Sequence, residues 1–185
     1  MNNRLLHAAA ALTALMIAPS AFADGVYKHS RFAVDIGPDF RVSQKDETPT
    51  GGLLIDADFL TVKLGCSVTI LPLNGTPANP ATWNLPDRVV ANPELAFPLA
   101  AGTTQTFLRA QKFAGRSGFP SVELAVEKTD AAGKTKVSVM THTILDPSTQ
   151  AIMSCVQDDG YNRSEITDGE IDEMLKMGES LRPPE

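Results

Sequence analysis

The stretch that decides the fold runs from residue 121 to residue 145 and reads Ser121-Val-Glu-Leu-Ala-Val-Glu-Lys-Thr-Asp-Ala-Ala-Gly-Lys-Thr-Lys-Val-Ser-Val-Met-Thr-His-Thr-Ile-Leu145. In its first part Val122, Leu124 and Val126 recur at every second position, which is the period of a β-strand with one buried face. Turn residues follow at Asp130-Ala-Ala-Gly133, before a second strand-like run over 135–145. Two strands joined by so short a turn are antiparallel, because parallel strands need a long crossover. The stretch therefore predicts a β-hairpin.

The same alternation extends outward from this hairpin. Further strand-like runs lie at Arg31–Ile36, Leu53–Ala57, Leu60–Ile70, Thr104–Phe113 and around Cys155. Near the C-terminus the period changes, since Thr167-Asp-Gly-Glu170 has the form of a helix capping box and precedes apolar or small residues at helical spacing. These are Ile171, Met174, Leu175, Gly178 and Leu181. We therefore expect an α+β fold, with an antiparallel β-sheet of about six to seven strands flanked by helices in a single domain.

The first 23 residues predict a secretory signal peptide. They combine a basic Arg4, an apolar run of about 14 residues ending at Ala18, and small residues at Ala21 and Ala23. The run is shorter than the roughly 20 residues that span a bilayer, so we expect no stable membrane anchor after cleavage. Residues 24–185 are then one mature domain, and the predicted location is periplasmic or secreted.

The two cysteines, Cys66 and Cys155, each lie on the apolar side of a predicted strand. Two core-facing cysteines in an oxidising compartment predict a disulfide between Cys66 and Cys155. Two reduced, buried thiols are the alternative. A redox or nucleophilic role is disfavoured because no C-x-x-C spacing occurs and an apolar site raises the pKa of a thiol.

A proline-rich loop is predicted at 72–103, where six of the 13 prolines and the one tryptophan, Trp83, occur. Proline excludes both a long helix and a central strand, although Pro86 could begin a short helix over Asp87–Ala91. Because tryptophan and arginine dominate interface hot spots, Trp83, Asp87 and Arg88 are our candidates for a partner-binding site. The alternative for Trp83 is that it only covers the sheet.

No catalytic or cofactor motif is found in the sequence. There is no glycine-rich phosphate loop, no zinc-type ligand spacing, and Gly115-Arg-Ser-Gly118 departs from a nucleophile elbow because Phe119 stands where glycine is required. The acidic run 158–165 lacks the alternating register of a calcium loop. We therefore expect no catalytic residues, no metal and no cofactor. The net charge of −6 argues against nucleic-acid binding, which depends on Lys and Arg.

Short phrases along the chain resemble those of a known fold family. Gly37-Pro-Asp-Phe40 follows the first strand, Gly118-Phe-Pro120 leads into the hairpin, Met153-Ser-Cys155 lies in the last strand, and Ser180-Leu-Arg-Pro-Pro184 ends the final helix. In this layout the chain resembles the family of the photosystem II extrinsic subunit PsbP and the Ran-binding import factor Mog. The resemblance implies an antiparallel sheet sandwiched by helices, in proteins that act mostly by binding other proteins. It transfers no functional residue.

These observations together predict a non-catalytic, exported protein-interaction module. Its partner would be another exported or envelope protein, which it would serve as an accessory of an envelope complex or as an inhibitor or immunity-type partner. The alternative is a small-molecule or ion-binding periplasmic protein. An enzyme, which would have to use His142 with carboxylates, is the weakest of the three hypotheses.

Overall fold

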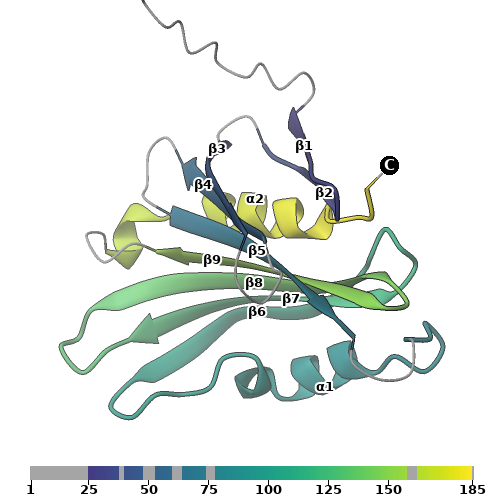
Figure 1. The fold of residues 1–185 in the computed structure, drawn as a ribbon. Helices are drawn as coiled ribbons and strands as arrows, with labels where there is room; N and C mark the ends of the chain where they lie inside the picture. Colours follow the sequence, from purple (N-terminus) through teal and green to yellow (C-terminus); the bar gives the residue numbers. More distant parts are fainter. Residues whose placement is uncertain are drawn as a thin grey trace, which may run out of the picture.

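A five-stranded antiparallel sheet forms the centre of the protein, in a computed structural model that describes residues 25–37, 40–47, 53–59, 64–73, 78–157 and 162–184. The predicted signal peptide lies outside these residues. The strands are β5 (Leu64–Pro72), β6 (Thr104–Ala114), β7 (Pro120–Thr129), β8 (Thr135–Asp146) and β9 (Thr149–Gln157), in the order β5-β9-β8-β7-β6. Figure 1 shows β5 at one edge and β6 at the other.

The predicted hairpin is present as β7 and β8. Asp130 Oδ1 accepts hydrogen bonds from the backbone N–H groups of Ala132 and Lys134, both at 2.9 Å. Gly133 has φ of 81°, a backbone conformation that glycine adopts without steric cost. Asp130 and Gly133, two of the residues from which the turn was predicted, therefore also stabilise it.

The prediction of about six to seven strands in one sheet is wrong, because two pairs of strands form separate ribbons. β1 (Val26–Lys28) pairs with β2 (Ala33–Asp35), and β3 (Phe40–Glu47) pairs with β4 (Leu53–Phe59). The other edge of β2 bonds to the C-terminal segment, since the backbone groups of Ala33 and Arg182 exchange hydrogen bonds of 2.9 and 3.0 Å. The strand predicted at Arg31–Ile36 is thus shorter and lies outside the main sheet.

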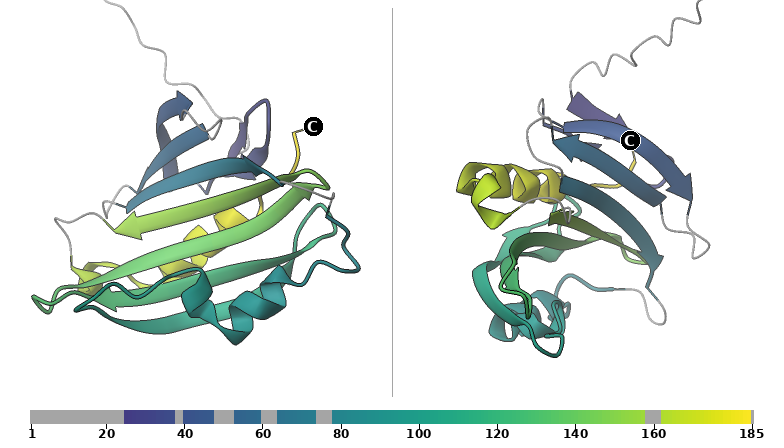
Figure 2. Two further views of the ribbon diagram at one scale, coloured as in Figure 1. Left: turned by 60° about the horizontal axis from the view of Figure 1, so that its bottom comes forward. Right: turned by 90° about the vertical axis from the view of Figure 1, so that its left-hand side faces the viewer.

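Helices cover both faces of the five-stranded sheet (Figure 2). α1 (Leu85–Ala91) packs on β6 and β7, and the short 3-10 helix η2 (Pro93–Leu95) follows it. α2 (Asp168–Glu179) packs on the opposite face against β7 and β8, after the 3-10 turn η3 (Arg163–Glu165). The predicted capping box is present, because Thr167 Oγ1 accepts from the N–H of Glu170 while the Glu170 carboxylate accepts from the N–H of Thr167. The predicted proline-rich loop thus contains a helix, which begins at Leu85, one residue before Pro86.

Two apolar cores result from this layering. The larger core lies between α2, the β1–β2 ribbon and the inner face of β5, β9 and β8, and it contains the fully buried Phe32, Met153 and Met174. The smaller core lies under α1, where Val89 and Phe97 meet Leu124. Because adjacent strand residues point to opposite faces, the apolar row of β7 faces α1 and its other row faces α2.

Cys66 and Cys155 form the predicted disulfide. The two residues are direct partners in the β5–β9 register, with Cα atoms 3.9 Å apart and an S–S bond of 2.08 Å. Both side chains are buried. The bond therefore links the edge strand β5 to the adjacent strand β9, on the face of the sheet that borders the larger core.

Candidate functional site

The residues that the sequence nominated for partner binding lie together in and beside α1, but they differ in their contacts. Asp87 forms an ion pair with Lys112 of β6 at 2.5 Å, which joins the helix to the edge strand of the sheet. Arg88 is exposed and forms no ion pair or hydrogen bond of its side chain within the part of the chain that the structure describes. Among the three residues, Arg88 is thus the one whose charge is available to a partner.

Trp83 covers the sheet. Its ring is half-buried and meets the His142 ring edge-on, with ring centroids 6.4 Å apart and an interplanar angle of 85°. His142 Nε2 also lies 2.7 Å from Gln150 Oε1, and burial lowers the pKa of His142, so the imidazole is neutral at neutral pH. Trp83 therefore has a structural role here whether or not it also touches a partner.

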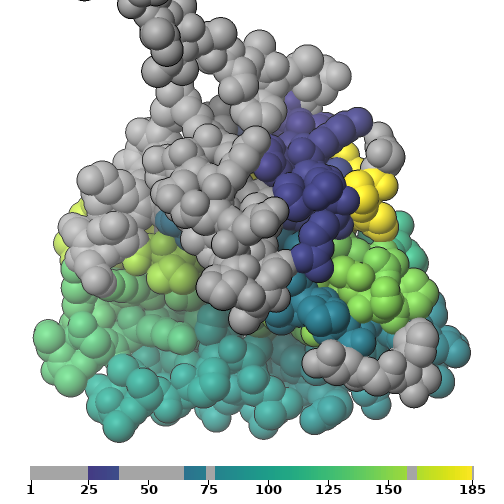
Figure 3. All heavy atoms as spheres, viewed as in Figure 1, coloured from purple at the N-terminus to yellow at the C-terminus, as the bar shows by residue number. Residues whose placement is uncertain are grey.

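Two leucines next to α1 point outward. Leu95 is 54% exposed and Leu99 is 52% exposed, whereas Val89 and Phe97 of the same segment are buried in the core beneath it. In the space-filling view, α1 and its neighbours belong to the teal surface at the bottom of the molecule (Figure 3). The segment 85–99 thus has a filled inner side and an outer side that carries apolar groups.

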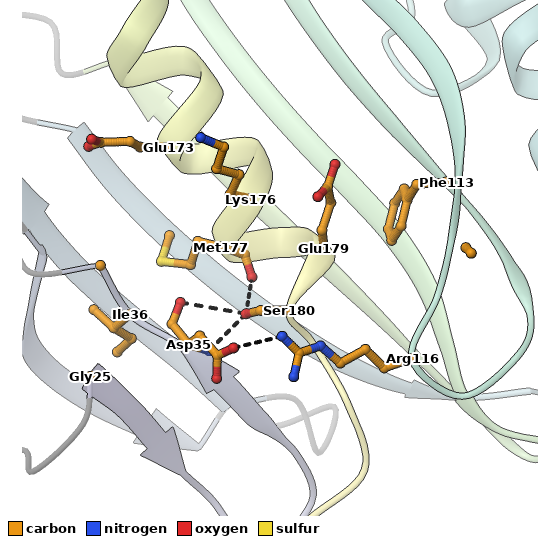
Figure 4. Close-up of a pocket in the computed structure, with 12 residues that line it drawn as sticks. Gly25, Asp35, Ile36, Phe113, Arg116, Glu173, Lys176, Met177, Glu179 and Ser180 are labelled. Carbon is orange, nitrogen blue, oxygen red and sulfur yellow. Dashed lines mark hydrogen bonds and ion pairs between the residues drawn. The ribbon is translucent and has the colours of Figure 1, made fainter.

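A cavity of about 790 Å³ lies on the other face of the sheet. Its walls come from three elements: the β1–β2 ribbon with Asp35 and Ile36, the end of β6 with Phe113, and the second half of α2 with Lys176 and Glu179 (Figure 4). The sequence alone does not predict this cavity, because its walls meet only when the ribbon and α2 pack on the same side of the sheet.

Asp35 forms hydrogen bonds that connect the three walls of the cavity. Its carboxylate accepts from Arg116 at 2.8 Å and from Arg182 at 2.7 Å, and its backbone N–H donates to Ser180 Oγ at 2.7 Å. The Ser180 hydroxyl in turn donates to the carbonyl of Met177 at 2.6 Å, at the end of α2. The frame of the cavity is therefore held by charge-assisted hydrogen bonds from three separate segments.

A buried carboxyl group lies between β7 and α2. Glu123 of β7 has 0% exposure, and its Oε1 atom accepts a hydrogen bond from Gln111 Nε2 and lies 3.7 Å from a guanidinium nitrogen of Arg109. Burial, followed by the influence of the Glu179 carboxyl group, raises the pKa of Glu123 to about 7, although Gln111 and Arg109 oppose the rise.

The sequence pattern did not reveal Glu123, for a physical reason. The residue alternates with Val122 and Leu124, so it belongs to the polar face of a strand, and a polar face is normally exposed to solvent. Here α2 covers that face. The signal that could have found the site is the combination of a capped amphipathic helix after the sheet and a carboxylate in the middle of a central strand.

Other candidate groups have structural roles. Ser117 of the motif 115–118 donates its hydroxyl to the carbonyl of Ile144, and the motif forms the turn between β6 and β7. No group of three or more His, Cys, Asp or Glu side chains within the described ranges could hold a metal ion. The run 158–165 is described only from residue 162 onward. None of the helices described here is long and apolar enough to cross a membrane.

No family model matches the sequence, and no curated protein matches it. Two solved structures are similar in fold. The solution structure of cyanobacterial PsbP from Synechocystis has a TM-score of 0.46 at 10% identity, covering 91% of this chain and 98% of that chain. The apo structure of the T6SS immunity protein TplEi from Pseudomonas aeruginosa has a TM-score of 0.42 at 19% identity, covering 82% of this chain and 48% of that chain. One of these two structures is a PsbP, the protein whose fold family the sequence resembles.

Proposed function

We propose that this protein is a non-catalytic interaction domain that acts outside the cytoplasm by binding another exported or envelope protein through the outer side of residues 85–99. The observation that carries the proposal is that the side chains of Leu95 and Leu99 are each more than half exposed to solvent. They lie in the same segment as Arg88, whose side chain has no ion-pair partner among the described residues. Burying a leucine in an interface contributes about 1.5–3 kcal/mol, which is the reason an outward apolar pair next to a charge favours a binding surface.

The rigidity of this segment supports the same proposal. The Asp87–Lys112 ion pair attaches α1 to β6, and Val89 and Phe97 fill the core below. A surface that is already ordered loses little conformational entropy when a partner binds. The partner that fits is a protein with an apolar hollow for the leucines and a carboxylate for Arg88. The disulfide supports a site of action in an oxidising compartment.

The test compares two double variants of the oxidised protein as baits in a periplasmic extract. Arg88→Glu with Leu95→Ser removes the charge and one leucine of the proposed surface. Leu108→Ser with Val156→Ser is the matched control, because these side chains are also exposed, at 42% and 48%, and lie outside the segment. We expect a stoichiometric partner that the first variant loses and the control keeps. In calorimetry with the purified partner, the dissociation constant of the first variant should be at least about tenfold higher than that of the wild type.

Two outcomes would refute this function. One is capture of the same partner equally by both variants, which would place the contact elsewhere on the molecule. The other is a complete absence of stoichiometric capture by the folded wild-type protein. Circular dichroism of both variants shows whether each is folded, so that a loss of binding is not read from an unfolded chain.

A further inference from the structure

Strand β6 leaves one edge of the five-stranded sheet without a strand partner in the part of the chain that the structure describes. It pairs with β7 on one side only, and the backbone of residues 104–114 bonds to no other described segment. Figure 1 shows β6 as the outermost strand at this end of the sheet. A free edge eleven residues long presents N–H and C=O groups to which another strand can bind.

The pairing with β7 indicates which backbone groups of β6 point outward. At the turn between the two strands, the N–H of Gly115 donates to the carbonyl of Phe119, so these residues form a hydrogen-bonded pair. Bonded and non-bonded pairs alternate along an antiparallel ladder, so the even-numbered residues of 110–114 direct their N–H and C=O groups away from β7. Pro120, which has no N–H, lies opposite Ala114 and agrees with this assignment.

The two cations of this segment do not block the edge. Proteins commonly prevent strand addition by placing charged side chains along an edge strand. Here Lys112 contacts Asp87 of α1 at 2.5 Å, and Arg109 contacts Asp172 of α2 at 2.6 Å. Each cation is thus paired with a carboxylate on one face of the sheet. The β-bulge of β6 immediately precedes Arg109, so the backbone after it has a regular pairing geometry.

The sequence of this segment is complementary to itself in one antiparallel register. Because only outward groups can bond, an even-numbered residue of one copy must lie opposite an even-numbered residue of the other. A register centred on Lys112 places two lysines directly opposite each other, which is unfavourable. A register centred on Phe113 is short, because β6 ends at Ala114. A register centred on Gln111 avoids both problems.

The register centred on Gln111 pairs unlike groups. Ala110 of one copy lies opposite Lys112 of the other, and each such pair exchanges two backbone hydrogen bonds. Arg109 lies opposite Phe113, which places a guanidinium group next to an aromatic ring. Leu108, which is 42% exposed, lies opposite the exposed Ala114, so apolar surface is removed from water.

We propose that the protein forms a two-fold symmetric dimer in which the β6 strands of two copies pair antiparallel about Gln111. The two five-stranded sheets then form one continuous sheet. Both copies use the same surface, so the contact is closed and does not propagate into a fibre. Because a strand pair of this length buries less area than a standard interface, the dimer is reversible, with a micromolar dissociation constant. The contact is separate from the outer surface of residues 85–99, and it does not depend on the proposed function.

Sedimentation equilibrium of the folded, oxidised protein tests the dimer, between about 5 µM and 1 mM. We expect the mass to rise with concentration from one chain to two. Amide hydrogen exchange followed by NMR locates the contact. The amide hydrogens of Ala110 and Lys112 should exchange more slowly in concentrated than in dilute protein, whereas that of Gln111, which points toward β7, should not change.

Two substitutions at one position test the register. Ala110→Lys places a cation opposite Lys112 of the second copy and should weaken the dimer by about tenfold or more. Ala110→Glu places a carboxylate there and should leave the dimer as tight as wild type or tighter. The two side chains are similar in length, so they disturb the packing of Ala110 under α1 to a similar extent. Leu95→Ser with Leu99→Ser, on the outer surface of residues 85–99, is the control and should change the dissociation constant less than about twofold.

A proline variant keeps the proposal testable if both Ala110 variants are unfolded by circular dichroism. Ala114→Pro removes an outward N–H and no bond to β7, and it should weaken the dimer. A mass of one chain for the folded wild-type protein at about 1 mM would overturn the proposal. So would equal effects of Ala110→Lys and Ala110→Glu, loss of the dimer in the Leu95 and Leu99 variant, or exchange at Ala110 that is independent of concentration.

Discussion

The carboxyl group of Glu123 is fully buried between the sheet and helix α2, so its titration affects the stability of the folded protein. Its pKa rises from the usual 4.5 to about 7 in the folded protein, chiefly through burial. The folded state therefore binds more protons than the unfolded state between these values, and stability falls as pH rises through that window. A shift of this size corresponds to about 3 kcal/mol, which is fully lost above pH 7 and fully regained below pH 4.5.

The variant Glu123→Gln tests this sign. Glutamine cannot ionise, so the free energy of unfolding of the variant, relative to wild type, should increase by about 3 kcal/mol between pH 4.5 and pH 8. Urea denaturation at several pH values measures the difference, and Glu173→Gln on the exposed side of α2 serves as the control. Parallel stability curves for wild type and Glu123→Gln would show that Glu123 titrates as it does in the unfolded chain.

Helix α2 lies close to the sheet because glycine occupies one position of its inner face. A Cβ atom at Gly178 would lie 2.8 Å from Thr141 Cβ and would also overlap the outer atoms of that side chain. Thr141 is fully buried in β8 and cannot move away easily. Gly178→Ala should therefore push the end of α2 from the sheet, and we expect a loss of about 2 kcal/mol despite the better helix propensity of alanine.

A double-mutant cycle separates crowding from other effects of this substitution. Thr141→Ala removes the outer atoms that meet the new methyl group, and it breaks no hydrogen bond, since Thr141 Oγ1 is buried without a partner among the described residues. The double variant should recover at least half of the stability lost by Gly178→Ala, measured by thermal or urea denaturation. Additive losses would indicate that the cost arises from the backbone of α2 and not from the contact.

The sequence predicted helix α2 well, but it did not predict which residues of the sheet the helix contacts. The capping box and the apolar stripe depend on residues close together in the chain, so the places of Thr167 and Leu175 in the helix follow from the local pattern. The contact between Gly178 and Thr141 depends on how the helix crosses the sheet, which no local pattern states. For the same reason β3 was not predicted, because Phe40-Arg-Val-Ser-Gln-Lys-Asp-Glu47 is mostly polar and forms a strand only by pairing with β4.

The molecule as a whole is a sheet covered on both faces, and this explains which sites could be predicted. The outer candidates Trp83, Asp87 and Arg88 follow from a composition change along the chain, and the structure places them together around α1. Their role in binding remains a prediction. The cavity could not be predicted, because Asp35, Phe113 and Glu179 come from segments far apart in sequence. A strand face that looks polar in sequence becomes an interior site only when a later helix covers it.

The disulfide constrains the chain over most of the described fold, and its removal should lower stability more than any single contact. Cys66 and Cys155 are 89 positions apart, so the bond limits the conformations of a long loop in the unfolded state. On the chain-entropy model a loop of this length is worth about 4–5 kcal/mol, a large share of the 5–15 kcal/mol typical of a domain. The variant Cys66→Ala, Cys155→Ala should therefore unfold at a clearly lower guanidinium concentration than the oxidised protein.

The reduced wild-type protein is the control for this variant. Kept in dithiothreitol, it should unfold close to the variant, because both lack the cross-link while the β5–β9 pairing remains. If the oxidised and reduced proteins unfolded at the same concentration, the bond would contribute nothing to stability. The nine-residue pairing of β5 with β9 would then by itself account for the attachment of this edge strand.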